Sequence, residues 1–303
     1  MKEANALFSF LYSALLSEKT KKSAEIFFVS LAIISFLLHL TIIALVDLKI
    51  ILINDYSKLL SNPISAIYTP FSFILIYEVY LLVYYLPKST TIYIGKQYEI
   101  ITLIIIRRIF KDLTKLEFSE NWLNSKANVN FTLDILATII LFFLLFLFYN
   151  LNKKNEINQS KIQKTFDINS FIKLKKVFAI GLIPIFLVLS IYSLAHWIYE
   201  SFFSLTQIVD KIKDINKIFF ADFFTILILI EVLLLLFSFF LSDKFNKVIR
   251  NSGFIISTIL IKLSFGAEGI LNTILIVAAV LFGVIILAIH NKYEKLEAKV
   301  SVV

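Results

Sequence analysis

The chain has 303 residues, of which 59% are hydrophobic, and its mean hydropathy is +0.85. A soluble domain has about 45 to 50% apolar residues, so this composition excludes an ordinary water-soluble protein. Cysteine is absent, which excludes disulfides, thiolate catalysis and cysteine-bound metal clusters. The net charge of +8 does not indicate nucleic-acid binding, because the lysines lie beside hydrophobic runs and suit anionic lipid headgroups.

The N-terminal segment, residues 1–25, begins with a short apolar stretch that is followed by charged residues. It has no small-residue cleavage pattern of the kind that ends a signal peptide. We expect an interfacial amphipathic helix on the cytoplasmic face, with its lysines among the lipid headgroups.

Long apolar runs after residue 25 predict membrane-spanning helices, each of which needs roughly 20 mostly apolar residues. The runs do not alternate in the way that the strands of a transmembrane barrel do. We therefore predict an all-α polytopic integral membrane protein with about eight transmembrane helices. The expected spans are 26–46, 67–86, 92–110, 131–149, 177–198, 219–241, 253–265 and 270–289.

Two of these spans are weaker than the rest. The third contains Lys96, Glu99 and the Arg107-Arg108 pair, and the seventh is short for a bilayer. A re-entrant or tilted helix would account for either of them.

Lysine and arginine predict the orientation of the spans. With the N-terminus inside, the basic residues fall in alternate loops, whereas the remaining loops are balanced or acidic. The linker 151–176, which contains Lys173 and Lys175, and the charged tail 291–303 are then cytoplasmic. We predict cytoplasmic N and C termini in a cell membrane of the inner or plasma-membrane type.

The two halves of the chain resemble each other. Residues 72–82 align with 225–235, which places Glu78 on Glu231, and residues 99–107 align with 254–262, which places Arg107 on Lys262. We predict two tandem four-helix repeats, 26–150 and 177–290. An even number of spans in each repeat gives the copies a parallel orientation.

Glu78 and Glu231 lie too deep in their spans for a short side chain to reach the headgroups. Ionisable groups at this depth are costly, so they usually face a bundle interior or an aqueous cavity. A buried carboxylate that is paired with a cation stabilises the fold, whereas one that is protonated or lines water can carry a proton or bind an ion. Both glutamates are therefore candidates for ion binding or relay, and polar contacts within each repeat are the alternative.

Arg107, Arg108, Asp134 and Lys262 are candidates for charge pairs. Arg107 is expected about 10 Å from Glu78 along the membrane normal, which favours Asp134 as the partner of Arg107 or Arg108. Asn272 and Glu268 lie near Lys262 in the sequence. Snorkelling of the basic side chains to the interface is the alternative.

The three scattered histidines do not form a metal-ligand pattern, and we find no glycine-rich phosphate loop or nucleophile elbow. We therefore expect no enzyme, cofactor or metal site. The duplicated intramembrane charges favour an ion channel or an ion/proton-coupled transporter. The alternative is a non-enzymatic membrane effector or interaction subunit that works through homo-oligomerisation or through a cytoplasmic protein partner docked on the linker and tail.

Overall fold

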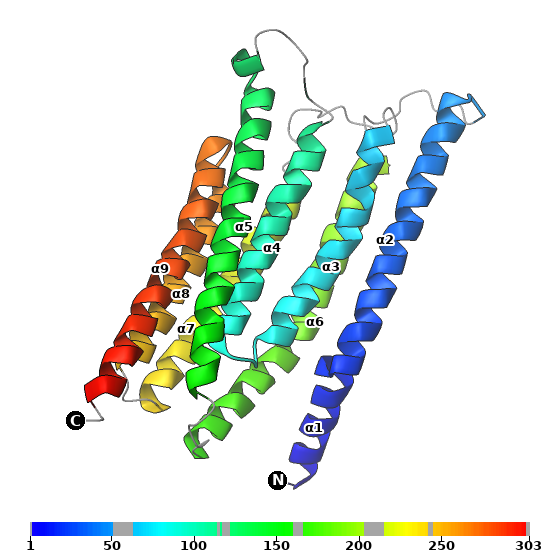
Figure 1. The fold of residues 1–303 in the computed structure, drawn as a ribbon. Coiled ribbons are helices and arrows are strands. Elements are labelled where there is room, and N and C mark those ends of the chain that lie inside the picture. The colour runs from blue at the N-terminus through cyan, green and yellow to red at the C-terminus, as the bar shows by residue number, and fades with distance from the viewer. Residues whose placement is uncertain are drawn as a thin grey trace. The chain divides into compact units, whose positions relative to one another are not determined.

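The computed structural model describes residues 2–50, 63–113, 116, 122–159, 166–202, 215–241 and 245–300, and within these ranges every regular element is a helix (Figure 1). The all-helical prediction is confirmed for this part of the chain. The elements are α1 (Lys2–Leu16), α2 (Glu18–Asp47), the 3-10 helix η1 (Pro63–Ile67), α3 (Tyr68–Tyr85), α4 (Thr90–Leu113), the 3-10 helix η2 (Trp122–Asn124), α5 (Lys126–Gln159), α6 (Phe166–Phe202), α7 (Ile215–Leu241), α8 (Phe245–Gly266) and α9 (Ile270–Val300).

Six stretches of the described residues are long and apolar enough to cross a membrane, and they indicate a multi-pass membrane protein. They are Phe8–Asp47, Lys126–Lys153, Phe171–Ser193, Asp222–Phe239, Phe245–Gly266 and Ile270–Glu297. Thr69–Tyr85 is a shorter apolar helix. In hydrocarbon a helix satisfies its own backbone hydrogen bonds, which is why such apolar sequences adopt this structure.

Two helix boundaries differ from the sequence prediction. The seventh predicted span started at Gly253, but α8 begins at Phe245 and reaches a spanning length. The predicted linker 151–176 is also largely helical, because α5 continues to Gln159 and α6 begins at Phe166. Because these helix ends contain polar residues, a search for apolar runs did not detect the helix boundaries.

The chain forms two compact units, which we call unit 1 (1–84, 104–135 and 180–219) and unit 2 (85–103, 136–179 and 220–303). Helices α4, α5 and α6 each contribute one end to each unit. The predicted repeats and the predicted domain boundaries stay predictions, because a compact unit need not coincide with a sequence repeat.

In unit 1, α1 and α2 are separated by Ser17, whose hydroxyl caps α2 by accepting a hydrogen bond from the Thr20 amide at 3.1 Å. The interfacial location predicted for residues 1–25 stays a prediction. Further along α2, Ile43 packs with Ala66 of η1, and His39 Nδ1 lies 2.5 Å from the Thr69 hydroxyl of α3.

Three tyrosines of α3 connect it to the start of the chain within unit 1. Tyr77 donates a hydrogen bond to Glu25 at 3.3 Å, Tyr80 donates to the Leu15 carbonyl at 3.0 Å, and Tyr84 donates to Glu18. These contacts fix α3 against α1 and α2.

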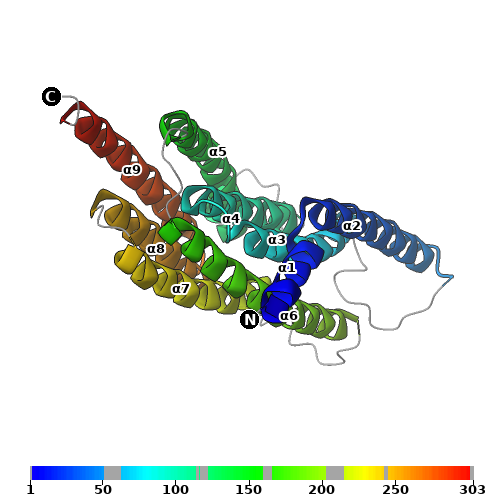
Figure 2. The same cartoon turned by 90° about the horizontal axis from the view of Figure 1, so that it is seen from below.

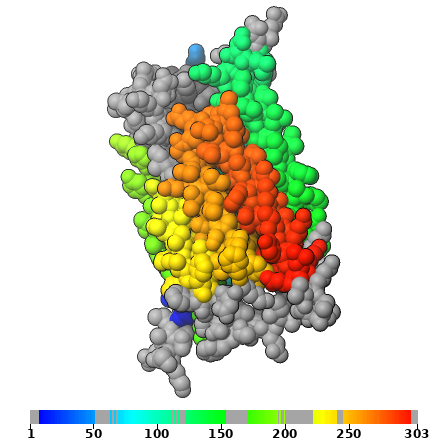
Figure 3. All heavy atoms as spheres, turned by 90° about the vertical axis from the view of Figure 1, so that its left-hand side faces the viewer, coloured from blue at the N-terminus to red at the C-terminus, as the bar shows by residue number. Residues whose placement is uncertain are grey.

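In unit 2, α8 and α9 lie side by side next to α7, as Figures 2 and 3 show. A Cβ atom on Gly253 of α8 would lie 2.8 Å from the Ile286 side chain of α9, so the glycine permits this close approach. On the exposed side of α5, Ile139, Phe142 and Phe146 form an apolar surface that suits lipid contact.

Candidate functional site

Glu78 of α3 and Arg107 of α4 form a buried ion pair in unit 1. Their side chains are 3% and 7% exposed, respectively. The guanidinium also lies 5.9 Å from the centroid of the Phe71 ring, which is a cation–π distance. Glu78 is therefore neutralised by a neighbouring cation.

This pair corrects the expected separation of about 10 Å between Glu78 and Arg107. That expectation counted rise along the helix axes and ignored the direction of the side chains. Each Cα–Cβ bond in a helix tilts toward the helix N-terminus. The chain reverses at residues 86–89 between α3 and α4 (Figure 1). The two side chains therefore lean toward each other and close the gap.

Arg108 and Asp134 form a second ion pair in unit 1. Nε and Nη2 of Arg108 donate to the two oxygens of Asp134, each at 2.5 Å. This two-point geometry is the strong form of an arginine–carboxylate contact. Asp134 is thereby assigned to Arg108 and not to Arg107.

Glu231 of α7 lies in unit 2 and has a different environment from Glu78. Gln97 of α4 donates a hydrogen bond from Nε2 to Glu231 Oε1 at 2.5 Å. The Thr258 hydroxyl of α8 donates to Gln97 Oε1 at 2.9 Å, which fixes the orientation of the amide. Glu231 is 7% exposed, and its direct partner is a neutral amide.

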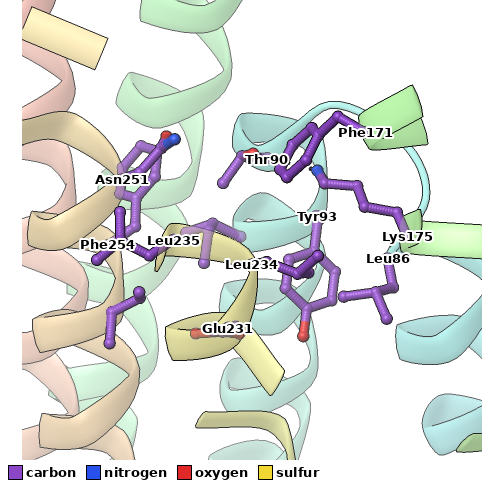
Figure 4. Close-up of a pocket in the computed structure, with 12 residues that line it drawn as sticks. Leu86, Thr90, Tyr93, Phe171, Lys175, Glu231, Leu234, Leu235, Asn251 and Phe254 are labelled. Atoms are coloured by element: carbon purple, nitrogen blue, oxygen red, sulfur yellow. Dashed lines mark hydrogen bonds between the residues drawn. The ribbon is translucent and has the colours of Figure 1, made fainter. Parts of the chain in front are cut away.

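Glu231 lines a cavity (Figure 4). By distance and angle, neither Oε2 of Glu231 nor the hydroxyl of Tyr93, both buried, makes a hydrogen bond with a described residue, but the two side chains lie close enough to interact electrostatically. Thr90, Lys175 and Asn251 also line the cavity, together with leucine, isoleucine and phenylalanine side chains.

The space open to the centre of a water molecule in this cavity is about 40 Å³. Roughly 10 to 15 Å³ of such space suffices for one water. Buried polar atoms without protein partners usually contact water or an ion. The cavity therefore fits a few waters or a small ion, and it is too small for a larger solute.

Lys175, which the sequence analysis placed in a cytoplasmic linker, is a residue of α6. It is 6% exposed and lies in the apolar stretch Phe171–Ser193. Its Nζ donates to the Lys88 carbonyl at 3.2 Å and to the Thr90 hydroxyl at 3.3 Å, and it lies 5.1 Å from the centroid of the Phe171 ring.

Lys262, the predicted counterpart of Arg107, is half-buried in α8 and joins no ion pair among the described residues. Asn272 instead donates to the Ser264 carbonyl at 2.5 Å. Across the described ranges, no three His, Asp or Glu side chains gather closely enough to hold a metal ion.

The structure thus gives Glu78 and Glu231 different surroundings, although the sequence pattern makes them equivalent. Arg107 compensates the charge of Glu78, whereas Glu231 lines a cavity and has one carboxylate oxygen without a hydrogen bond. Sequence reasoning missed Tyr93, Gln97, Thr258 and Lys175, because it searched the spans for acidic residues and ascribed lysines to loops. Polar side chains at buried positions of apolar helices were the available signal.

Comparisons of the chain with protein-family models, with characterised proteins and with solved structures find no match.

Proposed function

We propose that the chain is a membrane ion channel or ion/proton-coupled transporter in which Glu231 binds or relays a small cation or a proton. The observation that carries this proposal is the unpartnered Oε2 of a buried carboxylate beside a cavity of about 40 Å³. Intramembrane carboxylates are expensive to bury and commonly mark ion pathways and proton relays. Gln97 supports this role because its amide holds the carboxylate in place without neutralising it.

In this proposal Glu78 has a stabilising role. A carboxylate that forms a direct ion pair with Arg107 has little affinity left for a second cation. Asp134 and Arg108 compensate each other in the same way.

We further propose eight spans in two tandem parallel repeats, with α4 included as a span despite its charges. Two features of the helices support this. Glu78 and Glu231 lie 153 residues apart (231 − 78) in α3 and α7, and α4 and α8 start 155 residues apart (245 − 90) at Thr90 and Phe245. Arg107 and Arg108 have carboxylate partners within unit 1, which lowers the cost of placing α4 in a membrane.

The proposed location is an inner or plasma membrane, with both termini in the cytoplasm. Lys292 and Lys295 follow the apolar part of α9 and would contact anionic headgroups on that side.

The test is ion flux into liposomes that contain the purified protein, with and without a membrane potential. Wild-type protein should conduct or exchange protons or alkali cations, and Glu231→Gln should reduce the flux at least about tenfold, roughly 1.4 kcal/mol at the relevant step. Glu231→Gln replaces the carboxylate with a neutral amide of the same shape, so insertion and folding should be retained.

Asp222→Asn is the matched control, because it removes a carboxylate from an exposed position of the same helix. This variant should keep wild-type flux. Wild-type flux in Glu231→Gln would refute the role of Glu231. A folded wild-type protein without flux would favour the non-enzymatic interaction subunit, working through homo-oligomers or a cytoplasmic partner.

A further inference from the structure

Two opposite charges line the cavity of unit 2 without forming an ion pair. Glu231 lies on α7 and Lys175 on α6, and Figure 4 shows both at the cavity wall. The Lys175 ammonium contacts a carbonyl and a hydroxyl, at 3.2 and 3.3 Å, and Glu231 contacts an amide. Neither residue joins an ion pair with any other charge in the described part of the chain.

We infer that Lys175 is an internal counter-ion that competes with Na⁺ or K⁺ for Glu231, so that cation entry expels one proton from the cavity. This inference rests on the proposed function and names its substrate class and its coupling residue.

Charge balance is the first reason. With Glu231 ionised and Lys175 protonated, the pair of groups has no net charge. Adding Na⁺ or K⁺ would give a net charge of +1 in a largely apolar cavity, which is costly. Loss of the Lys175 proton restores neutrality, and the cation then replaces the ammonium as the counter-charge of Glu231.

Cation entry is coupled to the loss of one proton from Lys175. An N–H bond of the Lys175 ammonium breaks, its electron pair stays on Nζ, and the proton passes to water in the cavity. The cation bonds to Glu231 Oε2, and the nearby Tyr93 hydroxyl, which makes no hydrogen bond by distance and angle, supplies a second oxygen. Lysine suits this exchange because a buried ammonium can lose its proton, whereas a guanidinium remains charged.

The other charged and titratable groups near the cavity belong to α4, α8 and α9. Tyr93 faces it from α4 with its hydroxyl group. On α8, Arg250 donates to the side chain of Asn251 at 3.1 and 3.3 Å and lies 3.2 Å from His290 Nε2. His290 in turn lies 3.4 Å from Glu294. The negative charge of Glu294 compensates the positive charge in this part of α8 and α9.

The ligands indicate an alkali cation in preference to a divalent one. Ca²⁺ and Mg²⁺ usually bind to several carboxylates or retain several waters. The cavity offers one carboxylate with neutral oxygens from Tyr93 and Thr90. Its volume of about 40 Å³ admits a partly dehydrated Na⁺ or K⁺ with a water.

The experiment measures cation binding and proton release together in the purified full-length protein in detergent. NaCl or KCl is added to a weakly buffered sample that contains a pH-indicator dye, with choline chloride as the ionic-strength control. Equilibrium dialysis with radioactive Na⁺ measures binding. Wild-type protein should release about one proton for each bound cation, and choline should release none.

Four variants refine the result. Lys175→Gln should bind the cation without proton release, and Lys175→Arg, which keeps its charge, should bind at least about tenfold more weakly. Lys173→Gln, at an exposed position two residues away, should match wild type. Glu231→Gln should lose both binding and release.

Cation binding without proton release in wild type overturns the inference, and so does unchanged release in Lys175→Gln. Absence of Na⁺ and K⁺ binding also overturns it. Proton flux that depends on Glu231 would in that case still support the proposed function, so the two failures are distinguishable. The wild-type measurement stands even if a variant does not fold.

Discussion

Gly283 of α9 makes room for the ring of Tyr98 in α4: a Cβ atom at position 283 would lie 1.7 Å from the tyrosine hydroxyl oxygen. Tyr98 is fully buried and hydrogen-bonds the Ser257 hydroxyl at 2.7 Å, which donates in turn to the Ala279 carbonyl at 2.7 Å. The position of α9 within unit 2 therefore depends on the missing side chain.

Gly283→Ala should lower the free energy of unfolding by about 1 to 3 kcal/mol, the usual cost of overpacking. Alanine is the better helix former by about 1 kcal/mol, so a net loss would identify the clash as the cause. Thermal unfolding in detergent, followed by intrinsic fluorescence, measures the effect. Gly181→Ala is the control, because no atom lies within 4 Å of its added Cβ, and it should be neutral or stabilising. Equal melting temperatures for the two variants would contradict the packing seen here.

The Glu78–Arg107 pair should show strong coupling in a double-mutant cycle. Glu78→Gln or Arg107→Met alone leaves one buried charge without its partner, which typically costs about 3 to 5 kcal/mol. The double variant removes both charges and should recover much of that loss. Stability is measured by the same thermal assay, and additive losses would argue against a direct pair.

Tyr93 and Tyr98 should respond differently to loss of the hydroxyl group. Tyr98→Phe removes a buried hydrogen bond and should lower the free energy of unfolding by about 0.5 to 1.5 kcal/mol. Tyr93→Phe removes a hydroxyl that makes no hydrogen bond by distance and angle, so it should lower stability less than Tyr98→Phe does while weakening cation binding. Tyr93→Phe with wild-type affinity for Na⁺ and K⁺ would remove Tyr93 from the proposed ligands.

The proposed orientation can be tested by thiol labelling, because the chain contains no cysteine. Single cysteines at the exposed positions Ser89 and Lys295 should react with a membrane-impermeant maleimide from the cytoplasmic side. Cysteines at Asn124 and Glu268, also exposed, should react from the opposite side. Labelling of Ser89→Cys and Asn124→Cys from the same side would mean that α4 does not cross.

Hydropathy alone predicted the helical class, because a long apolar run in a bilayer has few other ways to satisfy its backbone. It failed where polar residues continue a helix. The first turns of α8 contain Asn246, Lys247 and Arg250, and they are helical although they interrupt the apolar pattern. The full length of α8 is therefore known only from the structure.

Lys175 shows where prediction of the candidate site from the sequence failed. Its charge suggested a loop, yet it belongs to a buried stripe of α6 that continues with Ala179, Leu182 and Phe186 at helical spacing. That spacing was readable in the sequence and would have placed Lys175 inside. The contact between Gln97 and Glu231 was not readable, because it joins side chains 134 positions apart and depends on how α4 and α7 pack within unit 2.

The pairing of Glu78 with Arg107 also has an electrical consequence. A single charge that crosses the whole membrane field gains or loses about 2.3 kcal/mol per 100 mV, and this energy is what allows charged segments to sense voltage. A cation and an anion that move together do no net work against the field. Although α4 has two adjacent arginines, both are matched by carboxylates in unit 1, so this end of the helix carries no net gating charge.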